Sequence, residues 1–430
     1  MRYSAPPYMY DVLPYASSKE PWLTTARWRA IERHFREMVL RAGYREIRTP
    51  ILEPTELFKR SIGEATDIVS KEMFTFVDRG ERSLTMKPEG TAPAVRACIE
   101  HGLFAEHPLL KLFYIGQNFR YERGQKGRYR QHQQLGVEVF GATDPAIDAE
   151  VLALAMSFFT TLGVRCRLHL NSVGTSECRA TYREALKAYV RPSLAHLSEE
   201  GKMRFEVNPL RMLDTKDQKD LAILAGAPVL RDFLSEESSQ HFAQVQEYLT
   251  ALNIPFAIDD GLVRGFDYYS GTVFEIKGEG LGAQDALGGG GRYDGLVEEC
   301  GGTAVPGLGF GIGMERCLLA LEALGIAPPQ DDESPVAFII TAGEQQAGKT
   351  TAVRLLQTLR SAGIAADMDY LGKNFRRQFK RADDLGTKFY IIIGEDEVAS
   401  GTVQLKDRAS GEQEKIELDS VVPVIKSKLL

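Results

Sequence analysis

The stretch FRYERGQKGRYRQHQQLGVEVFG, residues 119–141, joins a cationic loop to a strand of alternating polarity. Five of the eleven residues from Arg120 to Arg130 are Arg or Lys. Apolar side chains recur at every second position on both sides of this loop, at Leu110, Leu112 and Tyr114 and again at Leu135, Val137 and Val139. Because a period of two is typical of half-buried strands, the stretch predicts a β-hairpin with a long basic loop.

The second strand of this hairpin gathers its polar groups on one face. Gln134, Gly136 and Glu138 project to the same side, and the glycine leaves room between an amide and a carboxylate. A small polar ligand would fit there, and arginines of the loop are suited to hold phosphate oxygens through paired N–H donors. The alternative is a solvated basic turn, because charge runs usually face water.

Composition indicates an ordinary enzyme with several domains. A length of 430 residues suggests about two to four domains. No apolar run approaches the roughly 20 residues that cross a bilayer, and the start MRYSAPPYMYD lacks the apolar region of a signal peptide, so we expect a cytoplasmic protein without membrane contact. A net charge of −7 argues against nonspecific coating of nucleic acid, although local basic patches remain compatible with it.

Cysteine and histidine spacing indicates no metal site and no disulfide framework. The five cysteines contain no CxxC pair, and the seven histidines form no HExxH motif. We therefore expect no structural metal bound by the protein.

The first patterned region is an amphipathic helix followed by a strand. The helix is predicted over Trp22–Gly43, where apolar residues recur at helical spacing and glycine provides a stop. The following YREIRTPILEP reads as a strand broken at Pro50 and Pro54, which places it at an edge. Such an edge suits a boundary with a second subunit, and it equally suits a core helix packed on an edge strand.

Two changes in the sequence pattern divide the rest of the chain. Charged helical segments fill residues 176–252, and strand and glycine patterns resume at Gly261, so this segment is predicted to be a helical insertion within a core of residues 1–330. Pro and acidic residues cluster at Ile326–Pro335. Alternating β and α patterns then predict a separate α/β domain over residues 335–430.

Glycine density is a second signal of a ligand site. Fourteen of the forty glycines lie between Gly278 and Gly313, which allows close approach of backbone to a ligand. The run GLGFGIG lacks the GxGxxG spacing of a dinucleotide fold. The alternative is tight packing of a strand against the following helix, MERCLLALEAL.

A phosphate-loop match also occurs, GEQQAGKT at Gly343–Thr350, between an apolar strand and a helix. Its interior, EQQA, is acidic and poor in glycine, whereas a phosphate cradle needs flexible backbone with inward N–H groups. An ordinary strand-to-helix turn is therefore favoured. A triphosphatase that acts through Lys349 and Thr350 is the competing hypothesis.

Several of these segments together resemble the class II aminoacyl-tRNA synthetases and, within them, the histidyl-tRNA synthetase family. Residues 22–54 are similar to the dimer-forming motif 1, residues 110–140 to motif 2 and residues 307–323 to motif 3. Two histidine-specific signatures are also matched, LVRGFDYYSGTVFE at Leu262–Glu275 and GGGGRYDGL at Gly288–Leu296. The resemblance runs over nearly the whole chain.

The resemblance implies a homodimeric α+β enzyme. Its core would be an antiparallel sheet flanked by helices, with a helical insertion and a C-terminal α/β anticodon-binding domain. It would activate L-histidine with ATP, which carries Mg²⁺, to histidyl-adenylate and then transfer the histidyl group to tRNA(His). The alternative is a noncatalytic synthetase-like regulatory subunit of histidine biosynthesis. Such proteins typically lack the anticodon domain and the arginine of LVRGxDYY, and this chain has both.

The resemblance also assigns the phosphate end of the site. Arg120 would hold the α-phosphate of ATP and Arg316 the phosphate tail, with Glu122 and Arg128 near the nucleotide. Arg264 would be the family's catalytic arginine, which approaches the same phosphate from the substrate side. Positive charge is what attack of a carboxylate on a phosphate requires, because negative charge accumulates on the phosphate oxygens.

The histidine end is assigned in the same way. Glu89, Gly90 and Thr91, in TMKPEGTAP, would bind the α-amino group together with Gln134. The imidazole end would be lined by Glu138, Tyr268, Tyr269 and Tyr293. An acceptor and a phenol at opposite edges of the ring would reject apolar isosteres, because buried polar groups would be left unpaired.

In the C-terminal domain the resemblance implies contact with tRNA. The segment GKNFRRQFKRADDLG carries five basic residues that overlap one side of a helix, namely Lys373, Arg376, Arg377, Lys380 and Arg381. The alternative is a solvated basic face.

Two positions depart from the family pattern. Lys87 stands where Arg is usual, and Gly124 replaces a usual Pro in the loop of motif 2. The glycine is expected to loosen that loop.

Overall fold

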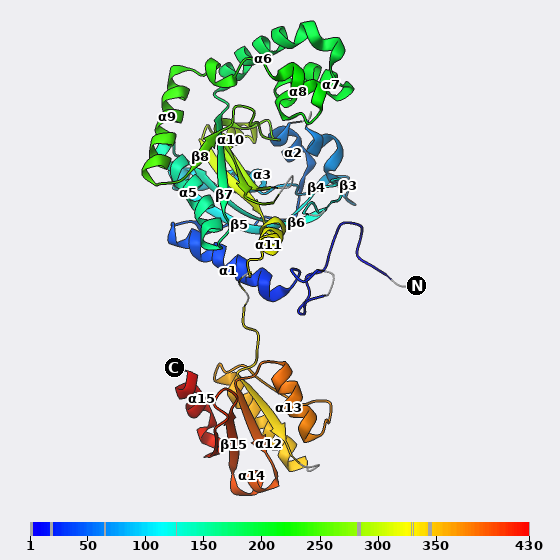
Figure 1. The fold of residues 1–430 in the computed structure, drawn as a ribbon, viewed down its shortest axis with the longest axis vertical. Coiled ribbons are helices and arrows are strands. Elements are labelled where there is room, and N and C mark those ends of the chain that lie inside the picture. Colours follow the sequence, from blue (N-terminus) through cyan, green and yellow to red (C-terminus); the bar gives the residue numbers. More distant parts are fainter. Residues whose placement is uncertain are drawn as a thin grey trace. The chain divides into compact units, whose positions relative to one another are not determined.

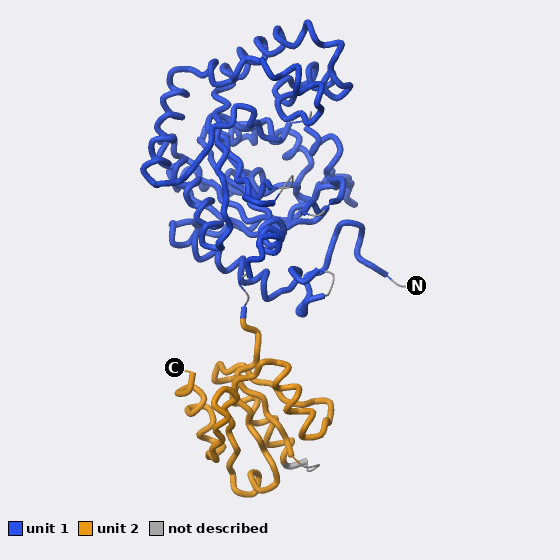
Figure 2. Tube along the Cα trace, viewed as in Figure 1, with its two compact units in different colours: residues 1–331 blue, residues 332–430 orange. Residues whose placement is uncertain are grey.

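In the computed structural model, the described residues are 3–17, 20–63, 66–125, 127–281, 285–327, 329, 331–342 and 346–429. They form two compact units, residues 1–331 and residues 332–430 (Figure 2). The predicted α+β fold, with an antiparallel-rich sheet and a C-terminal α/β domain, is confirmed. No helix in the described ranges is long and apolar enough to cross a membrane.

The first unit is built on an eight-stranded sheet (Figure 1). Its strand order is β1-β5-β6-β11-β10-β9-β7-β8, antiparallel except for the parallel pairs β1 with β5 and β7 with β8. The strands are β1 (Arg45–Glu46), β5 (Leu110–Phe119), β6 (Gln131–Phe140), β7 (Cys166–Ser172), β8 (Phe256–Ile258), β9 (Ser270–Gly278), β10 (Ala286–Arg292) and β11 (Gly307–Gly313). The predicted hairpin is β5 and β6, paired from Leu110 opposite Phe140 to Phe119 opposite Gln131.

Helices cover both faces of this sheet. The helices outside the insertion are α1 (Thr25–Arg41), α2 (Thr55–Ile62), α3 (Thr91–Glu100), α4 (Leu103–Glu106), α5 (Pro145–Thr161), α10 (Leu296–Glu299) and α11 (Met314–Ala323). Alternation along β6 separates the two faces. Leu135, Val137 and Val139 pack into the core formed with α1, α5 and α11, so the polar side chains between them point to the other face.

The predicted N-terminal helix is observed as α1. Its buried residues include Ile31, Phe35 and Val39, and Gly43 follows its end in the left-handed region at φ 84°. The predicted strand after it is divided between two sheets. β1 joins the large sheet, whereas β2 (Leu52–Pro54) pairs with β4 (Ser83–Met86), which also pairs with β3 (Phe74–Val77).

The insertion arches over the sheet on the side opposite α1 (Figure 1). It contains α6 (Ser176–Val190), α7 (Glu199–Val207), α8 (Gln218–Leu224) and α9 (Glu236–Ala251), with short 3₁₀ turns η2 (Arg191–His196), η3 (Pro209–Asp214) and η4 (Leu230–Phe233). The π turn η1 (Ile68–Glu72) lies outside it. Side-chain caps from Thr175, Ser198 and Ser235 begin α6, α7 and α9.

The second unit is a five-stranded mixed sheet with order β13-β12-β14-β15-β16. Its elements are β12 (Ala337–Thr341), α12 (Gln346–Ser361), β13 (Ala366–Met368), α13 (Phe375–Asp384), β14 (Phe389–Ile393), α14 (Glu395–Ser400), β15 (Thr402–Asp407), β16 (Gln413–Glu417), η6 (Leu418–Ser420) and α15 (Val421–Leu429). Within the phosphate-loop match, Gly343–Gln345 lie outside the described residues, and Lys349 is exposed on α12.

Candidate active site

A cavity of about 220 Å³ opens on the polar face of the eight-stranded sheet. Eleven of the residues predicted from the sequence line it together: Glu89, Thr91, Arg120, Glu122, Arg128, Gln134, Arg264, Tyr268, Tyr269, Tyr293 and Arg316. Gly90 and Glu138 are not part of this lining: Gly90 lies against the ring of Tyr114, and Glu138 accepts hydrogen bonds from Thr91 and Tyr293 of the lining. The five predicted basic residues of the C-terminal domain belong to the second unit, and all five are exposed.

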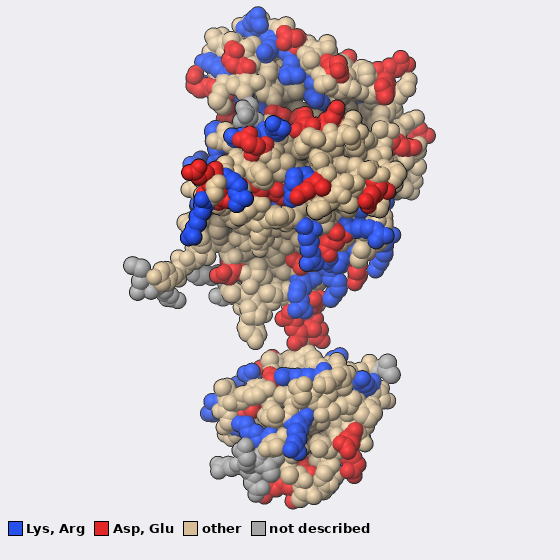
Figure 3. Space-filling view, turned by 180° about the vertical axis from the view of Figure 1, so that it is seen from behind, with Lys and Arg blue, Asp and Glu red and all other residues tan. Residues whose placement is uncertain are grey.

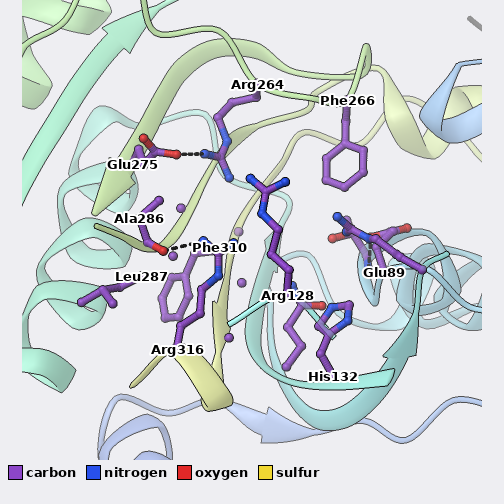
Figure 4. Close-up of a pocket in the computed structure, with 18 of the residues that line it drawn as sticks. Glu89, Arg128, His132, Arg264, Phe266, Glu275, Ala286, Leu287, Phe310 and Arg316 are labelled. Atoms are coloured by element: carbon purple, nitrogen blue, oxygen red, sulfur yellow. Dashed lines mark hydrogen bonds and ion pairs between the residues drawn. The ribbon is translucent and has the colours of Figure 1, made fainter. Parts of the chain in front are cut away.

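Arginines make one end of the cavity cationic. Arg128, Arg264 and Arg316 point into the same space (Figure 4). Arg316 is held by backbone carbonyls, with Nε donating to Gly127 O at 3.1 Å and Nη1 to Ala286 O at 2.6 Å. Burial, followed by the charge of Arg128, lowers the pKa of Arg316. An anion would therefore be strongly favoured at this end of the cavity.

Arg120 is fixed at the border between the two ends of the site. Its Nε donates to Pro88 O at 2.8 Å, and its guanidinium lies 5.5 Å from the ring centre of Phe266. The nearby pair of Arg128 Nη1 and Glu122 Oε2, 3.6 Å apart, is a loose contact. Glu122 is therefore available to a ligand donor.

Arg264 lies on the irregular segment between β8 and β9, here called the Arg264 loop (residues 259–269). Its Nη1 donates to Glu275 Oε1 at 3.2 Å, and its Nε is buried without a hydrogen-bond partner among the described residues. Both terminal nitrogens lie against Gly289, where an added Cβ would be 2.9 Å from each. The glycine-rich β10 is thus needed in part to admit this guanidinium.

Sequence reasoning missed two residues that complete the cationic end, His132 and Glu275, both in the cavity lining. Burial, followed by the charges of Arg120 and Arg316, lowers the pKa of His132 to about 3. Its ring is therefore neutral at physiological pH and presents a flat, uncharged surface beside the arginines (Figure 4). Glu275 is the last residue of the LVRGFDYYSGTVFE segment, and its carboxylate orients Arg264.

Carboxylates define the other end of the cavity. Glu89 accepts the backbone N–H groups of Thr91 at 2.6 Å and Ala92 at 2.7 Å, at the start of α3. Burial raises the pKa of Glu89, and these two hydrogen bonds oppose the rise. A ligand ammonium would supply the counter-charge that the buried carboxylate lacks.

Glu138 is buried beneath this end and is surrounded by hydroxyl donors. Thr91 Oγ1 donates to it at 2.7 Å and Tyr114 OH at 3.1 Å, and Tyr293 OH donates to its other oxygen. Burial raises its pKa to about 8, against the effect of these hydrogen bonds. Gly309 lines the cavity in front of it, and an added Cβ there would be 2.2 Å from Glu138 Oε2. The missing side chain is what opens the cavity onto this carboxylate.

The expected ligand space over Gly136 is not there. The ring of Tyr114 fills it, since an added Cβ on Gly136 would be 2.3 Å from Tyr114 Cζ. The same ring lies against Gly90, at 2.3 Å from an added Cβ. Both glycines therefore accommodate a structural tyrosine, and the ligand space lies beside the ring, in front of Gln134 and Gly309.

The two residues that depart from the family pattern, Gly124 and Lys87, each contact a segment that is distant in the sequence. Gly124 lies against Tyr8 of the N-terminal arm, and an added Cβ would be 2.0 Å from Tyr8 Cδ1. Arg130 N donates to Tyr8 O at 2.9 Å, so the arm holds the loop that the glycine was expected to loosen. Lys87 Nζ donates to Thr49 Oγ1 at 3.2 Å, and burial lowers its pKa.

The basic residues of the second unit lie on the solvent side of α13 and just before it. Arg376, Arg377, Lys380 and Arg381 are exposed, while Gln378 is buried and bonds to both backbone groups of Thr341. Among the described residues, no group of three or more His, Cys, Asp or Glu side chains is arranged to hold a metal ion.

Comparison with known proteins gives consistent matches along the chain. A family model described as histidyl-tRNA synthetase matches residues 23–317, and one described as an anticodon binding domain matches residues 336–428. The histidine–tRNA ligase of Pelotomaculum thermopropionicum is 49% identical over 404 residues, covering 94% of each chain. The crystal structure of apo S. aureus histidyl-tRNA synthetase matches with a TM-score of 0.81 and 40% identity, covering 99% of this chain and 100% of that one.

A structure titled ATP phosphoribosyltransferase regulatory subunit/histidyl-tRNA synthetase, from Bacillus halodurans, also matches. Its TM-score is 0.63 at 22% identity, and it covers 92% of this chain and 99% of that one. At that identity the likeness is one of fold alone.

Proposed function

Because the chain belongs to the histidyl-tRNA synthetase family and is a histidine–tRNA ligase, we propose that this cavity is where histidine is activated. The observation that supports the proposal is the meeting, in one cavity, of an arginine-rich end and a carboxylate end. The ATP phosphates would occupy the first and the amino acid the second. The carboxylate of histidine would then face the α-phosphate beside Arg120 and Arg264.

The reaction follows from this placement. A carboxylate oxygen of histidine forms a bond to the α-phosphorus while the bond from that phosphorus to the bridging oxygen breaks, and pyrophosphate leaves. Arg120 and Arg264 stabilise the charge on the α-phosphate oxygens, and Arg316 holds the leaving phosphates. The oxygen of a terminal ribose hydroxyl of tRNA(His) then forms a bond to the carbonyl carbon of the adenylate while the bond from that carbon to the phosphate oxygen breaks, so that AMP departs and the hydroxyl proton is released to water. Mg²⁺ enters with ATP and screens its phosphates.

The recognition of histidine divides between Glu89 and Glu138. We assign the α-ammonium to Glu89, with Thr91 and Gln134 beside it, and the imidazole to Glu138 and Tyr293. The rings of Tyr268 and Tyr269 close the sides of this end, with centroids 4.8 Å apart. A side chain that lacks a ring N–H would add no donor to those that Thr91, Tyr114 and Tyr293 already direct at Glu138, so it would bind more weakly than histidine, which gives selectivity without a second editing step.

The function is tested by histidine-dependent exchange of labelled pyrophosphate into ATP. We expect exchange with histidine alone among the twenty amino acids, and charging of tRNA(His) when the tRNA is added. A folded protein that binds histidine without exchange would instead be a noncatalytic regulatory subunit. Lys349→Ala is expected to have little effect, whereas a triphosphatase acting through Lys349 would lose its activity.

The second unit is proposed to bind the anticodon arm through the exposed basic residues of α13, in keeping with its family match. A chain that charges tRNA works where translation takes place, so we also propose a cytoplasmic location.

We further propose that the enzyme is a homodimer formed through the small sheet. Its edge strands β2 and β3 expose Leu52, Phe76 and Val77, and Ile51 is exposed just before β2, with exposed fractions of 41–67%. Such a concentration of apolar side chains suits a subunit interface.

Val77→Asp is expected to shift the protein from dimer toward monomer, because a carboxylate would be buried in the interface. Sedimentation velocity at micromolar concentrations measures the shift. Val353→Asp is the matched control, since Val353 is also exposed, by 51%, but lies on α12 of the second unit. A wild-type protein that sediments as a monomer would contradict the proposal.

A further inference from the structure

The N-terminal arm (residues 3–15) precedes α1 and contacts the basic loop (residues 120–130) between β5 and β6 (Figure 1). Its end is fixed to the start of α1, because Leu13 N donates to Leu23 O at 3.2 Å and Thr25 N donates to Leu13 O at 2.9 Å. The arm contains no Lys or Arg, and its first residues form the projection without charged side chains on the left of Figure 3. It therefore supplies no cation to a bound nucleotide, and any influence on the site passes through the residues that it contacts.

Tyr10 of the arm holds a carboxylate of the active-site cavity. Its hydroxyl donates to Glu315 Oε1, and Gln133 N donates to the same oxygen at 2.6 Å. Glu315 lines the cavity, is only 2% exposed and immediately precedes Arg316. Burial, followed by the charge of Glu315, raises the pKa of Tyr10, so its hydroxyl stays protonated and serves as a donor. Tyr10 thus fixes the carboxylate that joins the first turn of α11 to the start of β6.

The ring of Tyr10 fixes the end of the basic loop as well. It packs among three aromatic side chains, with centroid distances of 4.9 Å to Tyr129, 5.8 Å to Trp22 and 5.9 Å to Trp28. Tyr129 lines the active-site cavity. Two residues earlier, Gly127 O accepts from Arg316 Nε at 3.1 Å. The position of residues 127–133 therefore depends on Tyr10 as well as on Arg316.

Tyr8 connects the arm to the base of the same loop. Its carbonyl accepts from Arg130 N at 2.9 Å, and the carbonyl of Arg130 accepts from Arg120 N at 2.9 Å. Backbone hydrogen bonds thus run from the arm to the residue that would hold the α-phosphate. The Arg130 guanidinium lies 5.4 Å from the ring centre of Tyr8 and 3.6 Å from that of Tyr121. The ring of Tyr8 also fills the space over Gly124, so it contacts the loop at two positions.

The backbone of Tyr8 is strained. Its φ of 61° is in the left-handed region, which residues other than glycine seldom adopt. The side chain is 49% exposed, so burial in the core does not compensate for this conformation. Such strain persists where the surrounding contacts require it, and it concentrates at functional sites. The contacts of the ring with Gly124 and Arg130 are what the tyrosine supplies at a position where glycine would be unstrained.

We propose that Tyr8 and Tyr10 are positioning residues for ATP, which hold the basic loop and Arg316 in the arrangement that receives the nucleotide. The inference rests on the proposed function and assigns part of the affinity for ATP to the arm. A loop that is ordered before binding loses less conformational entropy on binding, so the ligand is held more tightly. Among the described residues, no hydrogen bond or ring contact joins the arm to Glu89 or Glu138. The arm should therefore affect the KM for ATP and leave the KM for histidine unchanged.

Tyr10→Phe tests the proposal, because it keeps the ring and removes the hydrogen bond to Glu315. In histidine-dependent pyrophosphate exchange, the KM for ATP should rise about tenfold, the scale of one hydrogen bond to a charged group. The KM for histidine and the maximal rate should stay within threefold of wild type. Tyr15→Phe is the matched control, since Tyr15 belongs to the same arm and is 78% exposed, and it should match wild type. An unchanged KM for ATP, or an equal rise in both KM values, would overturn the proposal.

Tyr8→Gly separates positioning from stability. Glycine adopts a φ of 61° without strain, so the unfolding temperature should not fall, whereas the KM for ATP should rise about fivefold. Gly124→Ala should also raise the KM for ATP, because its Cβ would be 2.0 Å from Tyr8 Cδ1 and would displace the ring. The double variant lacks this clash, so its KM for ATP should not exceed that of Tyr8→Gly alone. A lower unfolding temperature with an unchanged KM for ATP would show that Tyr8 has only a structural role.

Amide hydrogen exchange provides a readout that does not depend on turnover. If the arm favours ATP binding, ATP must in turn stabilise the contacts of the arm, because coupling between two sites is reciprocal. Saturating ATP should slow exchange in peptides covering residues 3–15 of the wild type, histidine alone should not, and Tyr10→Phe should reduce the effect of ATP. Exchange in the arm that is the same with and without saturating ATP would contradict the coupling.

The failure of this inference differs from the failure of the function. Without histidine-dependent exchange of pyrophosphate in the wild type, the proposed function fails. If that exchange is intact while Tyr10→Phe and Tyr8→Gly both keep the wild-type KM for ATP, only the role of the arm fails.

Discussion

Arg264→Ala is expected to lower the rate of histidine-dependent pyrophosphate exchange by about 10³-fold, which corresponds to about 4 kcal/mol of transition-state stabilisation. Arg264 Nε is buried without a partner among the described residues, and its Nη1 is oriented by Glu275. The guanidinium is therefore placed before the substrates arrive. Its charge acts most strongly when negative charge builds up on the α-phosphate, so the rate should fall more than the affinity for either substrate.

The measurement is steady-state exchange at varied histidine and ATP, with thermal unfolding as a check on folding. Lys277→Met is the matched control, because Lys277 lies on the same strand as Glu275, 3.6 Å from its carboxylate, without lining the cavity. It should change the rate less than threefold. If Arg264→Ala unfolds at the wild-type temperature and retains at least a third of the wild-type rate, Arg264 has no catalytic role.

The hairpin and its two faces could be predicted because both depend on local geometry. A period of two in residues 131–140 was enough to separate the apolar residues that pack with α1 and α5 from Gln134 and Glu138. His132 lies an even number of residues from Gln134 and Glu138, so the same alternation predicts that its side chain is on their face of the strand. The sequence does not reveal its surroundings, because the charges of Arg120 and Arg316 reach its ring only in the folded chain.

Other features depend on contacts between distant segments. The space over Gly136 looked open in the sequence, and it is filled by Tyr114 from the neighbouring strand. Gly124 looked flexible, and Tyr8 lies against it from more than a hundred residues away. The split of the Pro-broken strand between two sheets likewise depends on which strands are available as partners for β1 and β2. Periodicity does not encode such partners.

A cavity of about 290 Å³ that Arg179, Arg183 and Arg211 of the insertion line together with the Arg264 loop shows the same limit most clearly. Spacing alone places Arg179 and Arg183 on one side of a helix, which by itself is compatible with a solvated face. Arg211 lies in a different turn, and the Arg264 loop follows about fifty residues later. Only the folded chain brings these cations to one cavity with residues of the Arg264 loop.

Glu138→Gln is expected to raise the KM for histidine roughly 100-fold, because the variant loses a charged acceptor and leaves a buried polar network mismatched. Thr91, Tyr114 and Tyr293 all donate hydroxyl hydrogens to the carboxylate. A glutamine would direct its own N–H groups at one or more of these donors. The effect should appear mainly in KM for histidine, since the hydrogen bonds of Glu138 run to Thr91, Tyr114 and Tyr293 and not to the arginines of the cationic end.

The affinity for histidine should depend on pH through the ionisation of Glu138. The pKa of Glu138 is raised to about 8, so the empty site holds a proton at pH 7, and the stronger, charged acceptor for an imidazole N–H forms only when this proton leaves. The affinity of the wild type for histidine should therefore rise about tenfold per pH unit up to about pH 8 and level off above it. Glu138→Gln has no such proton to release, and its KM should stay flat over the same range.

Tyr114→Phe provides the matched variant. The Tyr114 hydrogen bond lowers the pKa of Glu138, so its removal should move the break in the pH profile upward while the ring still packs against Gly90 and Gly136. Exchange rates at varied histidine from pH 6.5 to pH 8.5 measure all three profiles. A wild-type KM that does not change with pH, or a Glu138→Gln profile that follows that of the wild type, would show that Glu138 does not bind the imidazole as an ionised acceptor.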